Sequence, residues 1–215
     1  MIKEKILQKI KDLGLLAVIR GPSAELTLKA VDALIKGGVL GIEITLSTPD
    51  AFSVVKTLND QYGSDIVLGM GTLTDPEQVS QAKKAGSKFL VSPIMEESLA
   101  KAMVNSELVS MVGAMTPSEI FKAYKLGSDV IKIFPGRLGG PDFIKDLRGP
   151  FPDIPLMPTG GVDLDNIADW FAAGVIAVGA GNNLCPKKLI MEGKFSEVTE
   201  IAKFFVEAVK KARQE

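Results

Sequence analysis

Two charged residues interrupt apolar segments of the chain. Lys132 lies in the run VIKIF, and Glu43 lies in the run GIEIT. If each run is a β-strand, side chains two positions apart share a face, so Lys132 shares a face with Phe134 and the isoleucines take the opposite faces. Branched aliphatic side chains suit the layer beneath covering helices. We therefore expect Lys132 and Glu43 to point together into the interior on the other side of the strands.

A lysine in such an interior is chemically useful. Burying an ammonium group is costly unless the group is paired or loses its proton. Burial therefore lowers the pKa of a lysine, and the neutral amine is a nucleophile that forms Schiff bases with carbonyl compounds. In that reaction Glu43 would be the general acid and base. The plainer alternatives are that Lys132 extends from a strand edge to water, and that Glu43 forms a structural salt bridge with it.

Glycine-rich turns follow the last two apolar segments of the chain. They are Thr159-Gly160-Gly161 and Gly179-Ala180-Gly181-Asn182. Glycines allow backbone N–H groups to converge on an anion, and the loops after strands seven and eight of a barrel commonly bind phosphate. One glycine pair is usually only a turn, but two pairs at these positions indicate a phosphorylated ligand.

The elements that must position these residues alternate between short apolar runs and longer amphipathic stretches. The runs start 19 to 26 residues apart, which fits one strand, one helix and two short loops per unit. We predict strands over Leu15–Ile19, Gly41–Thr45, Ile66–Gly69, Phe89–Ser92, Leu108–Val112, Val130–Phe134, Leu156–Pro158 and Val175–Gly179. Eight strands favour a closed (β/α)8 TIM barrel over an open doubly wound sheet, and no Ser-rich or Pro-rich linker divides residues 1–215 into smaller domains.

Two further helices and two helix starts are predicted. The stretch Ile2–Leu13 indicates an extra amphipathic helix before the first strand, and Ser196–Arg213 indicates the last helix, with Ser196 as its N-cap. The sequences that begin at Thr116 and Asp75 have the form of capping boxes followed by proline.

Composition excludes several classes of function. The chain has no histidine, which removes Ser-His-Asp and Cys-His nucleophiles and most zinc sites. The 25 Lys and Arg residues balance 26 Asp and Glu residues, so we expect no nucleic-acid partner. No apolar window is long enough to span a membrane, and neither the single cysteine nor the N-terminal segment indicates secretion. We therefore expect a cytoplasmic protein.

Six motifs carry a resemblance to a known family. In chain order they are Glu43-Ile44-Thr45, Gly69-Met70-Gly71-Thr72, Val91-Ser92-Pro93, Lys132-Ile133-Phe134-Pro135, Thr159-Gly160-Gly161-Val162 and Gly179-Ala180-Gly181. Together they resemble the motifs of the bacterial 2-keto-3-deoxy-6-phosphogluconate (KDPG) aldolases over nearly the full chain. The resemblance implies a homotrimeric TIM barrel of the Entner-Doudoroff pathway that needs no metal or other cofactor. It also implies cleavage of the phosphorylated keto acid to pyruvate and glyceraldehyde 3-phosphate through a lysine Schiff base.

The resemblance also implies roles for individual residues. Lys132 matches the Schiff-base lysine of the family and Glu43 its proton-shuttling glutamate. Around the pyruvyl end and the substrate hydroxyls, the implied substrate-binding residues are Thr72, Pro93, Phe134 and Thr159. The implied phosphate-binding residues are Gly160, Gly161, Gly181 and Asn182.

One departure from the family pattern concerns Ser47, which stands where many members have arginine. Serine lacks the bidentate charge of a guanidinium group. We hypothesise that Arg20, at the end of the first strand, supplies a charge to the substrate instead; the alternative is a solvent-exposed arginine at a strand end. Related galactonate aldolases also lack the arginine but tend to have an apolar residue at the position of Thr159, so the gluconate epimer is favoured.

Other activities remain open alternatives. Aldolases for the galactonate epimer or for 4-hydroxy-2-oxoglutarate share the expected chemistry. A phosphate-binding barrel isomerase would keep Lys132 charged, and a non-catalytic trimeric scaffold would have a vestigial site.

Overall fold

The computed structural model describes residues 2–214, and its centre is a parallel eight-stranded sheet. The strands are β1 (Leu15–Ile19), β2 (Gly41–Thr45), β3 (Val67–Gly71), β4 (Phe89–Val91), β5 (Val109–Ala114), β6 (Val130–Ile133), β7 (Leu156–Pro158) and β8 (Val178–Ala180). Each strand pairs with its sequence neighbours, and β1 also pairs with β8. A bridge between Thr159 and Gly179 joins the two remaining edges. The predicted (β/α)8 barrel is therefore confirmed.

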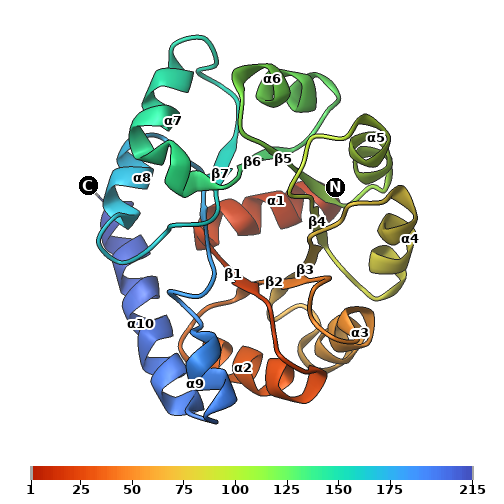
Figure 1. Ribbon diagram of the computed structural model, residues 1–215, viewed down its shortest axis with the longest axis vertical. Coiled ribbons are helices and arrows are strands. Elements are labelled where there is room, and N and C mark those ends of the chain that lie inside the picture. Colours follow the sequence, from red (N-terminus) through yellow and green to blue (C-terminus); the bar gives the residue numbers. More distant parts are fainter. Residues whose placement is uncertain (1, 215) are drawn as a thin grey trace.

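Helices surround this barrel (Figure 1). They are α1 (Ile2–Leu13), α2 (Ala24–Lys36), α3 (Ala51–Tyr62), α4 (Pro76–Lys84), α5 (Glu97–Asn105), α6 (Pro117–Lys125), α7 (Gly140–Arg148), α8 (Ile167–Ala172), α9 (Lys187–Met191) and α10 (Phe195–Ala212), with a 3-10 turn η1 at Gly136–Leu138. Capping boxes at Asp75 and Thr116 begin α4 and α6, as predicted, because each side chain and its partner three residues later satisfy free N–H groups of the first turn.

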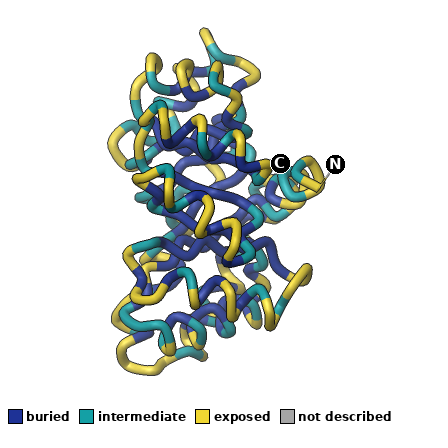
Figure 2. The backbone as a smooth tube through the Cα atoms, turned by 90° about the vertical axis from the view of Figure 1, so that its right-hand side faces the viewer, coloured by how far each residue is buried: buried dark blue, intermediate teal, exposed yellow. Residues whose placement is uncertain are grey.

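Apolar packing occurs in two layers on the two sides of the strands. Isoleucines such as Ile44 and Ile133 belong to the larger layer, between the strands and the outer helices. A smaller cluster fills the barrel interior, where Phe89 and Met157 are fully buried. Figure 2 shows the buried segments in the centre and the exposed ones at the periphery. The period of two within each strand thus separates the helix layer from the barrel interior.

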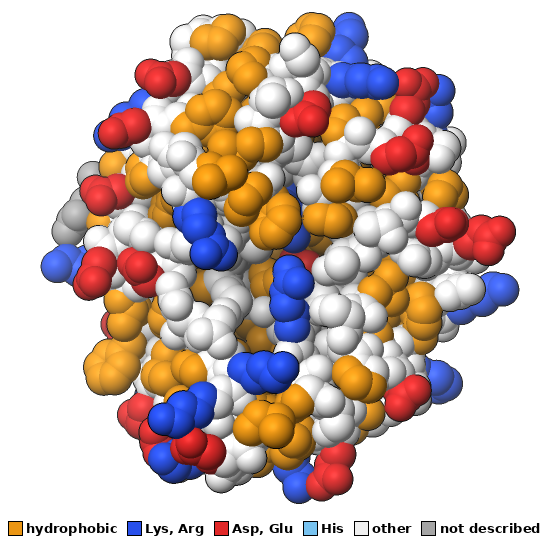
Figure 3. All heavy atoms as spheres, in the orientation of Figure 1, with side chains coloured by type: hydrophobic (Ala, Val, Ile, Leu, Met, Phe, Trp, Pro, Cys, Tyr) orange, Lys and Arg blue, Asp and Glu red, His pale blue; other side chains and the backbone are white. Residues whose placement is uncertain are grey.

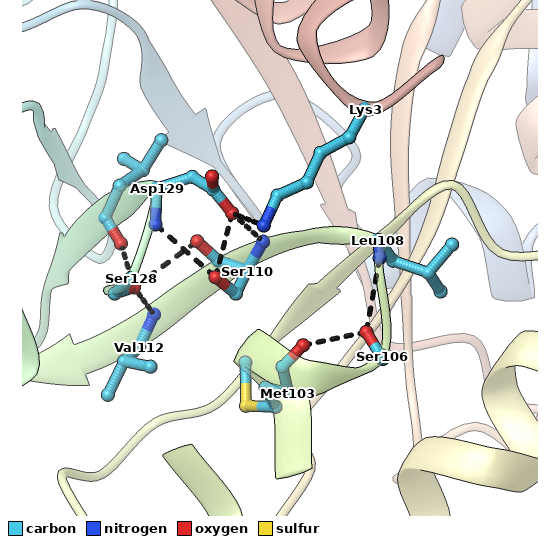
Figure 4. A network of polar contacts seen from close by, with 9 residues as sticks. Lys3, Met103, Ser106, Leu108, Ser110, Val112, Ser128 and Asp129 are labelled. Carbon is cyan, nitrogen blue, oxygen red and sulfur yellow. Dashed lines mark hydrogen bonds and ion pairs between the residues drawn. The ribbon is translucent and has the colours of Figure 1, made fainter. Parts of the chain in front are cut away.

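Helix α1 closes the amino end of the barrel. Its Ile10 is fully buried in the interior cluster, and Figures 1 and 2 together place α1 across the far end of the barrel in the view of Figure 1. A polar network ties this helix to the barrel: Lys3 Nζ lies 2.8 Å from Asp129 Oδ2 (Figure 4). The same oxygen accepts hydrogen bonds from the backbone N–H and hydroxyl of Ser110, both at 2.8 Å.

Some predicted boundaries differ from the structure. Strands β3 and β5 continue to Gly71 and Ala114, and β8 begins only at Val178 because the pairing of this segment with β1 starts there. The prediction that Ser196 caps the last helix is wrong. The helix begins at Phe195, so Ser196 lies inside its first turn. Helix α9 was not predicted.

The structure also bears on the prediction about membranes. In residues 2–214, no helix combines the length and the apolar character that a membrane span requires.

Candidate active site

Lys132 and Glu43 meet inside the barrel. Their side chains come from β6 and β2, with exposed fractions of 3% and 0%, and Lys132 Nζ lies 3.7 Å from Glu43 Oε1. Neither carboxylate oxygen of Glu43 has a hydrogen-bond partner within residues 2–214. The expectation that both side chains point into one interior is confirmed, and Lys132 does not reach bulk water as the strand-edge alternative required.

Burial determines the electrostatic state of the lysine. Removal from water lowers the pKa of Lys132 because the charged form loses hydration; the Glu43 carboxylate opposes this shift, and the Arg20 charge adds to it. The neutral, nucleophilic form of Lys132 is therefore populated at lower pH than in a solvent-exposed lysine.

The backbone of the neighbouring strand β3 packs closely against the side chain of Glu43. A β-carbon at Gly71, on the neighbouring strand β3, would lie 1.8 Å from Glu43 Oε1, so only glycine leaves room for the carboxylate. The next residue, Thr72, has a φ of 62°, a left-handed conformation that is strained for a β-branched side chain. Strain of this kind is most common at functional sites, and it fixes the direction in which Thr72 leaves the strand.

Pro93 is connected to Lys132 through β5. Gly113 of that strand is the register partner of Lys132, and its N–H donates a hydrogen bond of 3.1 Å to the hydroxyl of Ser92, the residue before Pro93. The ends of β3 and β4 thus bring Thr72 and Pro93 to the same end of the barrel as the buried pair.

A cavity of about 530 Å³ opens at the carboxyl ends of β1, β6, β7 and β8. Of the predicted site residues, its lining includes Arg20, Phe134, Thr159, Gly160, Gly161, Gly181 and Asn182. Lys132, Glu43, Thr72 and Pro93 are not part of this lining. Phe134 joins the two groups, because Lys132 Nζ lies 5.1 Å from the centroid of its ring.

The cavity carries positive charge. Arg20, Arg137 and Lys187 contribute to its lining, and no Asp or Glu among residues 2–214 does. Figure 3, in the orientation of Figure 1, shows a hollow in the middle of this face with basic side chains around it. The arrangement favours an anionic ligand.

One residue of the cavity lining, Thr159, has a polar group without a partner. Thr159 is 5% exposed, and its hydroxyl lacks a hydrogen-bond partner within residues 2–214. Gly160 and Gly161, which follow it, have φ values of 88° and 92°, so the turn depends on glycine. Thr159 therefore lines the cavity, while its hydroxyl oxygen is itself buried.

Two residues of the cavity lining, Arg137 and Lys187, were not predicted from the sequence. Arg137 lies four residues after the end of β6, the strand that carries Lys132. Lys187 lies after the last glycine turn. A search for cations in the loops after β6 and β8 could have found both.

Ser47, which stands where many family members have arginine, is exposed, and its hydroxyl lies 2.8 Å from that of Thr45.

Cys185 also lines the cavity but is not a candidate nucleophile. Burial raises the pKa of its thiol to about 12, so the thiolate is scarce at neutral pH. Among residues 2–214, no cluster of three or more His, Cys, Asp or Glu side chains could hold a metal ion.

Comparison with known proteins gives one family and several relatives. Residues 6–201 match the family model described as KDPG and KHG aldolase. The chain is 35% identical over 177 residues to the 2-dehydro-3-deoxy-phosphogluconate aldolase of Pseudomonas aeruginosa, which covers 82% of this chain and 80% of that protein. It is 31% identical over 198 residues to the 2-dehydro-3-deoxy-6-phosphogalactonate aldolase of Escherichia coli, and the match covers 92% of this chain and 97% of that protein.

Two solved structures have the same fold. A KDPG aldolase from Legionella pneumophila, with pyruvate captured as a covalent carbinolamine intermediate, has a TM-score of 0.83 and 29% identity, covering 90% of this chain and 94% of that one. A chain of a designed protein cage, made by fusing symmetric oligomeric domains, has a TM-score of 0.87 and 30% identity. The match covers 94% of this chain and 74% of that one.

Proposed function

The chain belongs to the KDPG and KHG aldolase family, and from this premise we propose that it is a lyase that cleaves 2-keto-3-deoxy-6-phosphogluconate to pyruvate and glyceraldehyde 3-phosphate. The observation that carries the proposal is the buried pair of Lys132 and Glu43, 3.7 Å apart, beside a cavity lined by cations. A buried amine is the nucleophile that a Schiff-base mechanism requires, and a cationic cavity suits a phosphorylated acid.

In the first half of the reaction, the neutral amine of Lys132 adds to the 2-keto carbon of the substrate. The resulting carbinolamine loses water and becomes a protonated imine, which accepts electrons from the adjacent carbon. The carbinolamine of pyruvate captured in the Legionella pneumophila enzyme supports this route.

In the second half, the Glu43 carboxylate removes the proton of the hydroxyl on carbon 4, through a water molecule. As the bond between carbons 3 and 4 breaks, its electron pair forms an enamine and glyceraldehyde 3-phosphate leaves. Protonation of the enamine and hydrolysis of the imine then release pyruvate and restore Lys132. Thr72 and Pro93 contact the pyruvyl end, with Thr72 bonded to its carboxylate, while Phe134 and Thr159 line the path to the phosphate.

The gluconate epimer is the proposed substrate, because Thr159 offers a hydroxyl where the galactonate aldolases tend to have an apolar side chain. A relative named as a galactonate aldolase makes that epimer the second candidate. Cleavage rates for both phosphorylated epimers and for 4-hydroxy-2-oxoglutarate decide between them. Faster cleavage of either alternative substrate would overturn this assignment.

Reductive trapping tests the chemistry itself. Borohydride reduces an imine between pyruvate and the enzyme to a stable secondary amine, and we expect the added mass on the peptide that contains Lys132. The adduct should disappear in Lys132→Met and persist in Lys125→Met, a change of an exposed lysine on α6. Absence of the adduct from the unaltered enzyme would favour a phosphate-binding isomerase, and absence of any turnover would favour a scaffold.

We also propose that the enzyme is a cytoplasmic homotrimer. Exposed apolar side chains support association: Phe121 and Tyr124 on α6 and Leu138 in η1 are 47%, 41% and 71% exposed. Figure 3 shows hydrophobic side chains gathered over α6 and α7 in the upper part of this face. The relative in a cage built from symmetric oligomeric domains supports an oligomer as well. A buried single cysteine requires no oxidising compartment.

Light scattering after size-exclusion chromatography tests the trimer. The expected mass is three times the chain mass of 22.9 kDa. Phe121→Glu should lower it, because a charge would be buried at the contact. A monomeric mass at micromolar concentration would contradict the proposal.

A further inference from the structure

We propose that Arg137 and Lys187 together bind the terminal phosphate of the substrate, one from each of the two glycine turns, and so select for a phosphorylated tail. This inference rests on the proposed function, because it assumes that the cavity receives the end of the substrate farthest from Lys132. Both residues line the cavity, and neither was assigned a role by the motifs of the sequence.

Arg137 is attached to the first glycine turn. Its backbone N–H donates a hydrogen bond of 2.8 Å to the carbonyl of Gly160. A β-carbon at Gly161 would lie 2.6 Å from the β-carbon of Arg137, so this glycine is packed directly against the arginine. The backbone of Arg137 is therefore held beside the turn, while its side chain remains exposed at the cavity.

Lys187 is attached to the second glycine turn. Its backbone N–H donates a hydrogen bond of 3.0 Å to the side-chain oxygen of Asn182, and Gly181 and Asn182 both line the cavity. Because β7 and β8 are joined at the Thr159–Gly179 bridge, the two turns lie side by side at this end of the barrel. The two cations thus approach one cavity from two loops that are distant in the sequence.

Arg137 and Lys187 differ from two arginines outside the cavity, Arg148 and Arg213. Arg148 donates hydrogen bonds to the carbonyls of Ile154 and Gly174, and Arg213 donates one to the carbonyl of Asp12. The side chains of Arg137 and Lys187 have no hydrogen bond or ion pair with any of residues 2–214. Their charges are therefore available to a ligand.

Thr159 lies beside the two cations, and its buried hydroxyl has no hydrogen-bond partner within residues 2–214. The residue is buried and lines the same cavity as the two cations. A buried polar group of this kind normally has a hydrogen-bond partner, either in the protein or in an ordered water molecule.

The chemistry of the two cations favours phosphate over carboxylate. A phosphate monoester carries a charge between about −1.5 and −2 at neutral pH and offers three acceptor oxygens, whereas a carboxylate carries one charge on two oxygens. The planar guanidinium of Arg137 matches two phosphate oxygens, and the ammonium of Lys187 can reach a third. Removal of the two cations should thus weaken the binding of a phosphorylated substrate strongly. It should weaken the binding of a substrate without phosphate only a little.

The test measures condensation of pyruvate with glyceraldehyde 3-phosphate in Arg137→Gln, Lys187→Gln and the double variant. Loss of a hydrogen bond to a charged group corresponds to about a 10-fold to 100-fold change, so we expect KM for glyceraldehyde 3-phosphate to rise by that factor for each residue. The rate of borohydride trapping with pyruvate alone should stay within about twofold of the unaltered enzyme, because pyruvate carries no phosphate. The effect on KM should be larger at low than at high salt.

Lys188→Gln is the matched control, since it removes the same charge from the neighbouring residue of α9, which lies outside the cavity lining. It should leave KM for glyceraldehyde 3-phosphate unchanged. Arg137→Lys, which keeps the charge but not the planar fork, should give an intermediate KM.

The inference is overturned if the KM in Arg137→Gln and Lys187→Gln stays within about twofold of that in Lys188→Gln. It is also overturned if both variants slow pyruvate trapping as much as they slow condensation. If the unaltered enzyme forms no adduct with pyruvate, the proposed function itself fails. The two failures are therefore distinguishable.

Discussion

Two sets of buried polar side chains, one around Asp129 at the amino end of the barrel and one around Glu43 at the carboxyl end, differ in their hydrogen bonding. At the amino end, Asp129 Oδ2 accepts hydrogen bonds from the N–H and hydroxyl of Ser110 and lies 2.8 Å from Lys3 Nζ (Figure 4). At the carboxyl end, the carboxylate of Glu43 and the hydroxyl of Thr159 have no hydrogen-bond partner within residues 2–214. The amino end is covered by α1, and the carboxyl end opens into the cavity.

This difference separates stability from chemistry. A satisfied polar network and a covering helix contribute to the free energy of unfolding, whereas unbonded groups and a buried ion pair reduce it. Functional sites commonly retain such unfavourable groups because a substrate satisfies them. Substitutions at the amino end should therefore change stability and leave turnover intact, and substitutions at the carboxyl end should do the reverse.

The largest expected effect is on turnover in Glu43→Gln. The amide keeps the shape of the side chain but cannot accept the hydroxyl proton, so kcat for cleavage should fall by about 10²-fold to 10⁴-fold. Steady-state cleavage assays measure this change, and thermal unfolding measures the cost of leaving the buried Lys132 without its counter-charge. A kcat near that of the unaltered enzyme would remove Glu43 from the proton transfer.

At the opposite end, Ile10→Ala should destabilise the fold. Ile10 is fully buried between α1 and the barrel interior, and such truncations cost about 2–5 kcal/mol. Urea unfolding measures the free energy, while kcat of the folded enzyme should stay unchanged. A large loss of kcat in conditions where the variant is folded would show that the two ends are coupled.

Gly71→Ala tests the space beside Glu43. The new methyl group would collide with Oε1, so the carboxylate must move, and a displacement of about 1 Å at a catalytic group can cost about 10²-fold in rate. The expected loss is in kcat, since the cavity lining is unaltered. Gly149→Ala provides a comparison, because this exposed glycine, like Gly71, has no positive φ, and its β-carbon would meet only the carbonyl oxygen of Asp146 at 3.5 Å.

Asp129→Asn should have a smaller effect, confined to stability. The amide weakens the contact with Lys3 and the hydrogen bonds from Ser110, and disrupting a partly buried network of this kind costs about 1–3 kcal/mol. Chemical unfolding at low and high salt measures the change, and kcat should not move. Unaltered stability would mean that packing of α1 alone closes the amino end.

The smallest expected effect is a displacement of the pH profile. Trapping of pyruvate requires neutral Lys132, so its rate should rise with pH through a pKa that burial holds below the ordinary value of 10.5. Arg20→Gln removes a charge that lowers this pKa, so the profile should move to higher pH. Glu43→Gln removes a charge that raises it, so the profile should move to lower pH. Shifts of both profiles in the same direction would contradict this assignment of charges.

Much of the fold could be predicted because its determinants are local. Period-two alternation around Lys132 and Glu43 already implies a face, and the structure confirms that both side chains point inward. The capping boxes at Thr116 and Asp75 were equally visible, since their partners are three residues away. The cap at Ser196 was predicted wrongly, because a serine in the first helical turn has the same sequence context as one at the cap.

The candidate site could be predicted only in part. The glycine turns and Arg20 stand directly at strand ends, so their presence at the cavity follows from barrel topology. Arg137 and Lys187 lie in longer connections after β6 and β8, where no periodicity indicates direction. Their common cavity emerges only when the barrel closes.

The amino-acid sequence by itself determined which residues face the interior, because alternation along a strand is a property of the strand alone. It also determined the chemistry available, since a chain without histidine places a lysine and a glutamate inside apolar strands. Only the tertiary structure decided the distance of 3.7 Å between them and the meeting of cations from distant loops. Those distances depend on how the sheet curves and closes, which is a property of all eight strands together.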